Sequence, residues 1–284
     1  MEPHAQRNIL ITGCSSGIGR CVAAGLAHRG YRVFATTRRP DDAETLAQAG
    51  LESLVLDLDR PESIAEAVES VLERGGGTLY GLFNNGAYGL PGAVEDLSRN
   101  ALRAQFETNL FGWVDLTNRI IPVMRRQGVG RIIQNSSVLG LATLPYRGAY
   151  VATKFALEGL TDTLRLELRG SGIHVSLIEP GPIVSRFRDN ALRVFRRDID
   201  AEHSVHRDRY QAMLARLEKE GPAAPFTLPP EAVLRRVVHA LESPRPKPRY
   251  YVTVPTHLFG SLRRLLSTRM MDRLMLRVSG GGKR

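Results

Sequence analysis

Short apolar runs alternate along the chain with longer segments whose apolar residues recur at helical spacing. The short runs are rich in β-branched and aromatic residues and predict strands. Their ranges are 8–12, 32–37, 53–57, 79–85, 131–137, 174–180 and 250–254. One segment between them carries an expected apolar helix face at Ala156, Leu160, Leu164 and Leu168. Because strands and helices alternate, the sequence predicts an α/β fold: a doubly wound parallel sheet of about seven strands with helices on both faces.

The composition is that of one globular domain. The chain has 284 residues, of which 43% are hydrophobic and 24% charged, which is enough to bury a large core. Cys14 and Cys21 have no histidine near them in the sequence, so neither a disulfide framework nor a metal site is expected. Polar residues precede the first strand, and no run approaches the ~18 apolar residues of a spanning helix. A cytoplasmic protein, at most peripheral at a membrane, is therefore expected.

The net charge of +10 is concentrated in the last third of the chain. Residues 1–185 hold 18 basic and 19 acidic residues, whereas residues 186–284 hold 21 basic and 10 acidic ones. Such a surface suits nucleic acid, anionic lipid or an acidic substrate, or it is simply a solvated face. No zinc-finger, RNA-binding or helix-turn-helix pattern accompanies the basic residues, so no nucleic-acid partner is expected.

A glycine-rich stretch, ITGCSSGIGR, follows the first predicted strand. Glycines at a strand-to-helix turn let the backbone approach a pyrophosphate, and the free N–H groups of the next helix hold its charge. The spacing, with glycine at positions 13, 17 and 19, differs from the G-x-G-x-x-G of many dinucleotide folds. A purely connecting turn is the alternative.

The end of the second strand bears on which dinucleotide is bound. An acidic residue about 20 positions after the glycines selects NAD, whereas a basic one accommodates the 2′-phosphate of NADP. Here Arg38 lies 19 residues after Gly19, with Arg39 beside it. A guanidinium matches phosphate geometry, so NADP(H) is favoured over NAD(H), unless the two arginines are only exposed loop residues. Asp57 is expected either to accept a hydrogen bond from the adenine amino group or to cap the following helix.

Tyr150 and Lys154 lie four residues apart in a helical segment, so both project from one face. Lys154 is the only lysine in residues 1–185. A tyrosine that exchanges a proton with a carbonyl oxygen near pH 7 needs its pKa lowered from about 10, which takes about 4 kcal/mol. A nearby ammonium supplies a few kcal/mol, and its three freely aimed donors also suit a ribose. A surface tyrosine beside a solvated lysine is the alternative.

Six motifs follow one another in an order typical of one enzyme family. They are TGCSSGIG from residue 12, NNGA from 84, NLFG from 109, NSSVLG from 135, YVATK from 150 and PGPIVS from 180. Over about residues 7–255 the chain resembles the short-chain dehydrogenase/reductase family. Within it, the chain looks like the NADP-favouring branch of 17β-hydroxysteroid dehydrogenases, retinol dehydrogenases and bacterial aldehyde reductases. The resemblance implies a single Rossmann-fold domain over 1–255.

The resemblance implies a catalytic set of Asn109, Ser137, Tyr150 and Lys154. Ser137, thirteen residues before Tyr150, would hold the substrate oxygen, while Ser136 would face away. Tyr150 would be the general acid/base, Lys154 would lower its pKa and bind the nicotinamide ribose, and Asn109 would kink its helix and hold a relay water. Hydride would pass directly between nicotinamide and substrate carbon.

The expected cofactor-binding residues come from six segments. They are Gly13, Ser15, Ser16, Gly17, Ile18, Gly19, Arg38, Arg39, Asp57, Asn84, Asn85, Tyr150, Lys154, Pro180, Gly181, Ile183 and Ser185. Pro180 and Gly181 would lie beneath the nicotinamide, the Ile183 backbone would bind its carboxamide, and Ser185 would stand near the diphosphate. One departure is that Gly86-Ala87 replaces the family's Ala-Gly, which strains the turn if the second residue needs a positive φ.

The substrate region is expected in an insertion at 186–230, which is predicted to be a helical lid. Its apolar residues would either cover an apolar ligand or pack on the domain. They are Phe187, Leu192, Val194, Phe195, Tyr210, Met213 and Leu214. The stretch at 88–97 would supply the other wall, and 221–230 is predicted to be a proline-rich joint.

The extension at 256–284 has the composition of a basic amphipathic helix. Its arginines are Arg263, Arg264, Arg269, Arg273 and Arg277. Residues 257–278 would either contact anionic lipid peripherally or pack on their own domain or a second subunit. The family resemblance implies a homodimer or homotetramer through helices at 103–127 and 149–169.

The expected function is NADP-dependent hydride transfer between nicotinamide and a lipophilic ketone, aldehyde or alcohol of steroid, retinoid or fatty-aldehyde type. Two other classes stay open. A catalytically silent NADP-binding regulator would not need Ser137, Tyr150 and Lys154 together, and a lipid-surface adaptor would depend on the C-terminal extension alone.

Overall fold

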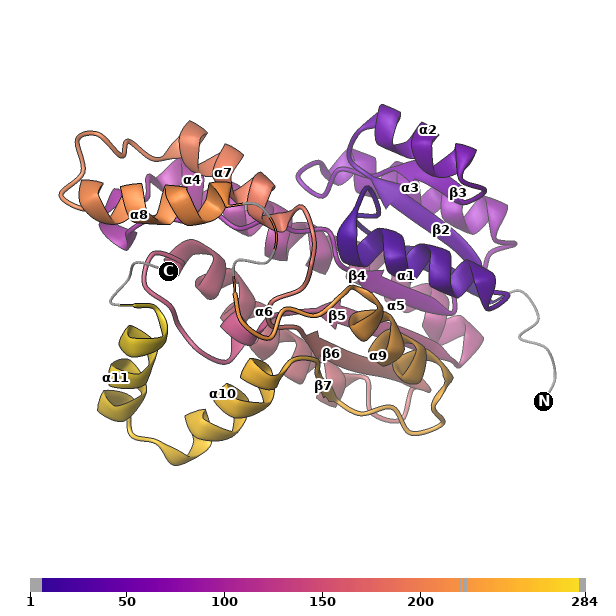
Figure 1. Cartoon of the computed structure of the whole chain (residues 1–284). Helices are drawn as coiled ribbons and strands as arrows, with labels where there is room; N and C mark the ends of the chain where they lie inside the picture. Colours follow the sequence, from indigo (N-terminus) through magenta and orange to yellow (C-terminus); the bar gives the residue numbers. More distant parts are fainter. Residues whose placement is uncertain (1–6, 220, 222–223, 281–284) are drawn as a thin grey trace.

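The computed structural model describes residues 7–219, 221 and 224–280 and forms one α/β domain (Figure 1). Its strands are β1 Asn8–Ile11, β2 Arg32–Thr37, β3 Glu52–Val55, β4 Gly81–Asn84, β5 Gly130–Asn135, β6 Ile173–Glu179 and β7 Arg249–Tyr251. They form a seven-stranded sheet in the order β3-β2-β1-β4-β5-β6-β7, and every neighbouring pair is parallel. The predicted fold class and all seven predicted strands are confirmed. The last strand is shorter than predicted because Val254 and Pro255 already open a helix.

Helices cover both faces of this sheet. They are α1 Gly17–His28, α2 Pro40–Gln48, α3 Pro61–Arg74, α4 Arg99–Phe106, α5 Gly112–Gln127, α6 Gly148–Glu167, α7 Phe187–Asp198, α8 Arg207–Glu218, α9 Glu231–Glu242, α10 Val254–Leu265 and α11 Thr268–Val278. Along β1, Ile9 and Ile11 face one core and Leu10 faces the other, because successive strand residues point to opposite faces. The doubly wound arrangement follows directly from this alternation.

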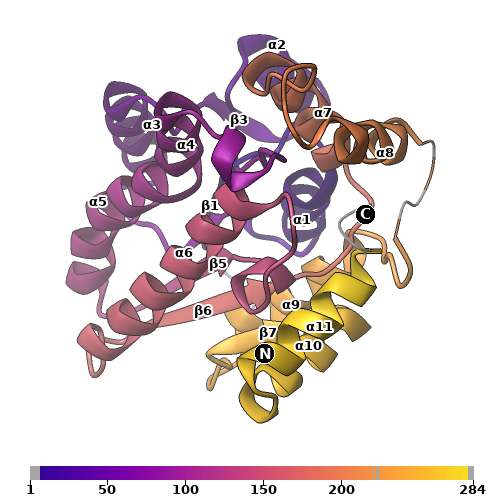
Figure 2. The same ribbon diagram turned by 90° about the vertical axis from the view of Figure 1, so that its left-hand side faces the viewer.

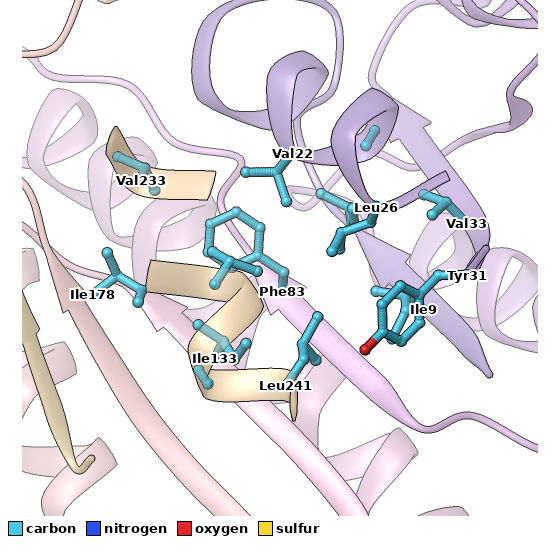
Figure 3. Close-up of a cluster of buried hydrophobic side chains, with 14 of the residues drawn as sticks. Ile9, Val22, Leu26, Tyr31, Val33, Phe83, Ile133, Ile178, Val233 and Leu241 are labelled. Atoms are coloured by element: carbon cyan, nitrogen blue, oxygen red, sulfur yellow. The ribbon is translucent and has the colours of Figure 1, made fainter. Parts of the chain in front are cut away.

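The first core lies between the sheet and helices α1 and α9 (Figure 3). There Val22 and Leu26 of α1 and Val233 and Leu241 of α9 pack on strand residues such as Phe83. The second core lies on the other face, where α3, α5 and α6 contribute residues such as Val68, Trp113 and Leu157. Both layers leave the carboxyl ends of the strands for the segments that carry chemistry.

Helix α6 buries the predicted apolar face only in part. Leu168, just after the helix, belongs to the second core, and Ala156 and Leu164 pack against it, whereas Leu160 is 48% exposed. The buried face is largely polar and includes Tyr150, Thr153, Lys154, Glu158 and Thr161. Apolar spacing does not reveal this polar face, because its polar groups are buried only by virtue of partners in other parts of the chain.

The helical segment predicted over 103–127 is interrupted. A π turn at Glu107–Phe111 separates α4 from α5 and contains Asn109. The turn gives the departure from a straight helix that the family resemblance led us to expect at this residue.

The lid region 186–230 contains α7 and α8, which lie together beyond one end of the sheet (Figures 1 and 2). Most of its apolar residues pack on the domain: Phe195, Tyr210 and Met213 are each at most 2% exposed. They contact Leu90 and Ala93 of the 88–97 stretch. Packing on the domain is therefore the outcome for most of the lid, and part of the predicted joint at 221–230 lies outside the described residues.

The C-terminal extension forms α10 and α11, which follow β7 and lie below α7 and α8 in the view of Figure 1. Phe259 of α10 and Met275 of α11 pack on Ala142, with Val138, Leu144, Met271 and Leu274 around them. The inner face of the extension thus packs on its own domain.

Candidate active site

The glycine turn between β1 and α1 is closely packed. Gly13 has φ +72°, and a Cβ there would lie 2.6 Å from the Gly86 Cα. A Cβ on Gly19 would lie 2.2 Å from the Gly13 carbonyl oxygen. Helix α1 begins after Ser16 with no side-chain cap and no acidic residue in its first turn. Its first N–H groups thus suit a phosphate, and the turn fits a dinucleotide.

Asn85 fastens this turn to the end of β4. Its side-chain amide donates to the carbonyl oxygens of Thr12 at 2.9 Å and Gly13 at 3.2 Å, while its backbone N–H donates to Thr12 Oγ1. Asn84 is different, because its buried amide donates to Thr117 of α5 at 3.0 Å. The order Gly86-Ala87 causes no strain, since neither residue has a positive φ.

The end of β2 places Arg38 and Arg39 at the surface. Arg39 forms an ion pair with Asp41 at 3.3 Å, whereas Arg38 has no hydrogen-bond or ion-pair partner within the described part of the chain. Asp57 uses Oδ1 to accept the Asp59 N–H at 3.2 Å, which holds the turn before α3 rather than capping that helix. Arg38 is therefore the guanidinium left available for a phosphate.

Ser137, two residues after the end of β5, lies near Tyr150 in the first turn of α6. Burial raises the pKa of Tyr150 to about 12, and a hydrogen bond with Ser137 opposes this rise. In this structure the pKa of Tyr150 is therefore raised, whereas the sequence led us to expect a lowered pKa. Ser136 faces Glu158 instead of Tyr150, as the family resemblance implied.

Lys154 is 1% exposed and has no carboxylate partner at ion-pair distance in the described chain. Its Nζ donates to the Asn135 carbonyl oxygen at 2.8 Å and lies 4.3 Å from the centre of a Trp113 ring and 5.6 Å from that of Tyr150. Burial lowers the pKa of Lys154 to about 7, although the Glu158 charge opposes this. The lysine can therefore gain or lose a proton near neutral pH.

Asn109, in the π turn, holds the loop that follows β4. Its Oδ1 accepts the Tyr88 N–H at 3.1 Å, and its Nδ2 donates to the Tyr88 carbonyl oxygen at 2.8 Å. Nδ2 also lies 3.4 Å from Thr153 Oγ1 on α6. The structure thus brings Asn109 close to the Tyr150–Lys154 helix, while its role as a water holder stays a prediction.

The 180–185 segment passes beside the start of α1. A Cβ on Gly181 would lie 2.1 Å from Thr253 Oγ1, and one on Gly17 would lie 2.8 Å from the Ser185 Cβ. The N–H of Ile183 has no hydrogen-bond partner among the described residues, which leaves it available for a carboxamide. Pro180 accepts the Val138 N–H at 2.8 Å and so links this segment to the loop after Ser137.

A cavity of about 450 Å³ opens where α1 meets this segment, and its lining includes Ser16, Gly17 and Ser185. It is also lined by Arg20 and Arg186, which the sequence analysis did not select. Arg20 directly follows the last glycine of the turn, so its place in the motif was the available signal. Both guanidiniums would add positive charge around a diphosphate.

Phe187 is the lid residue whose ring contacts Tyr150. Its ring centre lies 5.3 Å from that of Tyr150, and it is 37% exposed. A Cβ on Gly89 would lie 2.8 Å from the Phe187 ring, so the ring occupies space that Gly89 leaves open. Of the lid residues, Phe187 is thus placed to contact a substrate.

The parallel sheet with a glycine turn before α1 defines a dinucleotide-binding α/β protein. Residues 7–193 match the family model of short chain dehydrogenases, and the chain belongs to this family of NAD(P)-binding oxidoreductases.

Three similar proteins are named as oxidoreductases or dehydrogenases. An uncharacterized oxidoreductase of Escherichia coli, YbbO, is 45% identical over 95% of this chain and 94% of its own length. Human 17-beta-hydroxysteroid dehydrogenase type 1 is 35% identical over 88% of this chain and 78% of its own. The crystal structure of a Burkholderia phymatum short chain dehydrogenase/reductase in complex with NAD has a TM-score of 0.78 at 26% identity, covering 96% of both chains.

Proposed function

We propose that this protein transfers hydride between NADP(H) and a lipophilic ketone, aldehyde or alcohol, with Tyr150 as general acid/base. The observation that carries the proposal is that the Ser137 side chain lies near the Tyr150 hydroxyl, beside the buried Lys154. A merely structural tyrosine does not need a lysine without a carboxylate partner beneath it. In the reducing direction, a bound reduced nicotinamide would supply the hydride to the carbonyl carbon.

Tyr150 supplies the proton to the carbonyl oxygen in this direction. Its raised pKa keeps it protonated at neutral pH, which suits an acid that donates as negative charge develops on the substrate oxygen. Ser137 holds the same oxygen by donating a second hydrogen bond. Lys154, whose pKa lies near 7, then returns a proton toward the phenolate, and its Nζ binds the nicotinamide ribose.

The preference for NADP rests on Arg38. It has no partner among the described residues, and no acid at the end of β2 competes for ribose hydroxyls before Asp41. The related Burkholderia structure holds NAD, so the test must compare the two cofactors. We expect Arg38→Ala to lower kcat/KM with NADPH about tenfold and to leave the value with NADH almost unchanged.

A lipophilic substrate is supported by the Phe187 ring, which is 37% exposed and whose centre lies 5.3 Å from that of Tyr150. The relative named for a hydroxysteroid adds support. A homodimer is supported by exposed apolar residues on the helices of the expected contact, Phe111, Leu160 and Leu166, which are 50%, 48% and 69% exposed.

The test is the loss of reduced-nicotinamide absorbance with a panel of steroid ketones, retinal and medium to long aldehydes. Wild type is compared with Tyr150→Phe, using NADPH and NADH in parallel. Turnover that falls at least about 100-fold in Tyr150→Phe supports the proposal. Tight NADPH binding with no turnover of any substrate would favour the silent regulator, and vesicle binding alone would favour the lipid-surface adaptor.

A further inference from the structure

A cavity of about 500 Å³ lies outside the active site, between α9, β7 and α10. Its lining is basic and aromatic. The residues that matter here are Arg236, Lys247, Arg249, Tyr251, His257 and Arg264. Arg236 lies in α9, Lys247 and Arg249 lie just before and in β7, and Arg264 lies in α10, so the concentration of charge arises only in the fold.

Three of these cations have no partner in the described part of the chain. Arg249 is held by Glu158, Asp162 and Glu179. Within the described residues, the side chains of Arg236, Lys247 and Arg264 form no ion pair and no hydrogen bond. Unpaired guanidinium and ammonium groups around a hollow suit an anion, and the guanidinium fork suits phosphate in particular.

Beside the cavity, α10 exposes an apolar stripe. Val254, Leu258 and Leu265 are 58%, 50% and 79% exposed. At 100° per residue these three positions point within about 40° of one another on the helix. Arg264, next to Leu265, lines the cavity, so the stripe and the basic hollow adjoin (Figure 2 shows α10 at this edge).

We propose that this edge of the molecule binds an anionic bilayer, with a lipid phosphate in the cavity and the stripe of α10 at the acyl boundary. Positive charge next to exposed leucines is complementary to anionic headgroups above hydrocarbon. A second copy of this chain is a poorer occupant, because a two-fold contact here would oppose like charges. No helix in the described chain is long and apolar enough to span the membrane, so the contact is a surface one.

The experiment is co-sedimentation of the full-length protein with phosphatidylcholine vesicles that contain or lack one quarter phosphatidylglycerol. The test variant is Arg236→Gln with Lys247→Gln and Arg264→Gln. The matched control, Arg99→Gln with Arg125→Gln and Arg169→Gln, removes the same charge from exposed positions elsewhere. Each basic residue near an anionic surface contributes roughly fivefold, so the test variant should lose about 100-fold in partitioning and the control much less.

A second variant, Leu258→Ser with Leu265→Ser, should lose about tenfold in binding. Equal losses in the test and control triples would overturn the proposal, since net charge alone would then explain binding. Binding of inorganic phosphate in the cavity by a protein that does not bind vesicles would also overturn the proposal, because the cavity would then be a site for a free anion. A dimer in size-exclusion chromatography that the test triple dissociates, or binding to duplex DNA but not to vesicles, would also overturn it. Circular dichroism confirms that each variant is folded.

Discussion

Two cations, Lys154 of helix α6 and Arg249 of β7, have opposite surroundings. Lys154 is buried with only a carbonyl oxygen and aromatic rings around its Nζ. Arg249, across the helix on β7, is surrounded by three carboxylates, with Glu179 Oε1 at 2.7 Å and Asp162 Oδ2 at 2.5 Å, and with Glu158 closest. Burial alone would lower the pKa of both groups, but the carboxylates raise that of Arg249 above its usual value.

The difference separates a proton-handling cation from a structural one. A lysine with a pKa near 7 can change its charge during turnover, whereas an arginine paired with carboxylates stays charged and ties α6 to β6 and β7. Glu158 affects both cations, because it forms an ion pair with Arg249 and its charge raises the pKa of Lys154. Substitutions of Lys154, Arg249 and Glu158 test whether the two cations differ in this way.

The largest effect is expected for Lys154→Arg. The charge is kept but can no longer be released, and the planar fork fits poorly at 4.3 Å from Trp113. We expect kcat/KM for NADPH-dependent reduction to fall about 1000-fold. Arg169→Lys, two residues beyond the end of the same helix, is the control. Activity within tenfold of wild type would show that the positive charge alone suffices.

Arg249→Met should destabilise the fold by about 3–5 kcal/mol in urea unfolding, because it leaves buried carboxylates without a countercharge. Burial, with repulsion from Glu158, already raises the pKa of Glu179 to about 8. A carboxyl with a raised folded pKa loses stability as pH rises from its unfolded pKa toward its folded one. The loss should therefore be greater at pH 8 than at pH 5, and adding Glu179→Gln should recover part of it. A loss independent of pH would contradict the electrostatic cause.

Lys154→Met should have the opposite effect on stability. Because the folded pKa lies near 7 and the unfolded one near 10.5, the wild type carries its full burial penalty below pH 7 and loses it as pH rises toward 10.5. The free energy of unfolding should thus increase on substitution, by about 3 kcal/mol more at pH 6 than at pH 9. Urea titrations at the two pH values measure this. A variant less stable than wild type at pH 6 would mean that Lys154 is stabilised by its carbonyl contact.

The smallest effect is expected for Glu158→Gln. Since the Glu158 charge raises the pKa of Lys154, its removal should shift the basic limb of the kcat/KM profile to lower pH, by up to about one unit. Asp162→Asn is the matched control, because Asp162 also contacts Arg249 but is not among the charges acting on Lys154. Equal shifts in both variants would mean that loosening Arg249, rather than Glu158 itself, changes the profile.

Much of the site was predictable from short motifs. The glycine turn, Ser137 and the Tyr150–Lys154 pair lie where their spacing placed them, because each depends on a strand end or on one turn of a helix. The direction of the Tyr150 pKa shift was not predictable, since burial of the phenol depends on Phe187 and the loops around it.

The sequence by itself determined the seven strands, their parallel winding and the order of the chemical motifs, because periodicity and turn residues act over a few positions. Only the tertiary structure decided that α6 also buries a polar face with Lys154, and that most of the lid packs on the domain. It also decided that Arg249 meets Glu158, 91 positions earlier in the chain. The physical reason is that burial and charge pairing depend on neighbours in space, which local patterns do not specify.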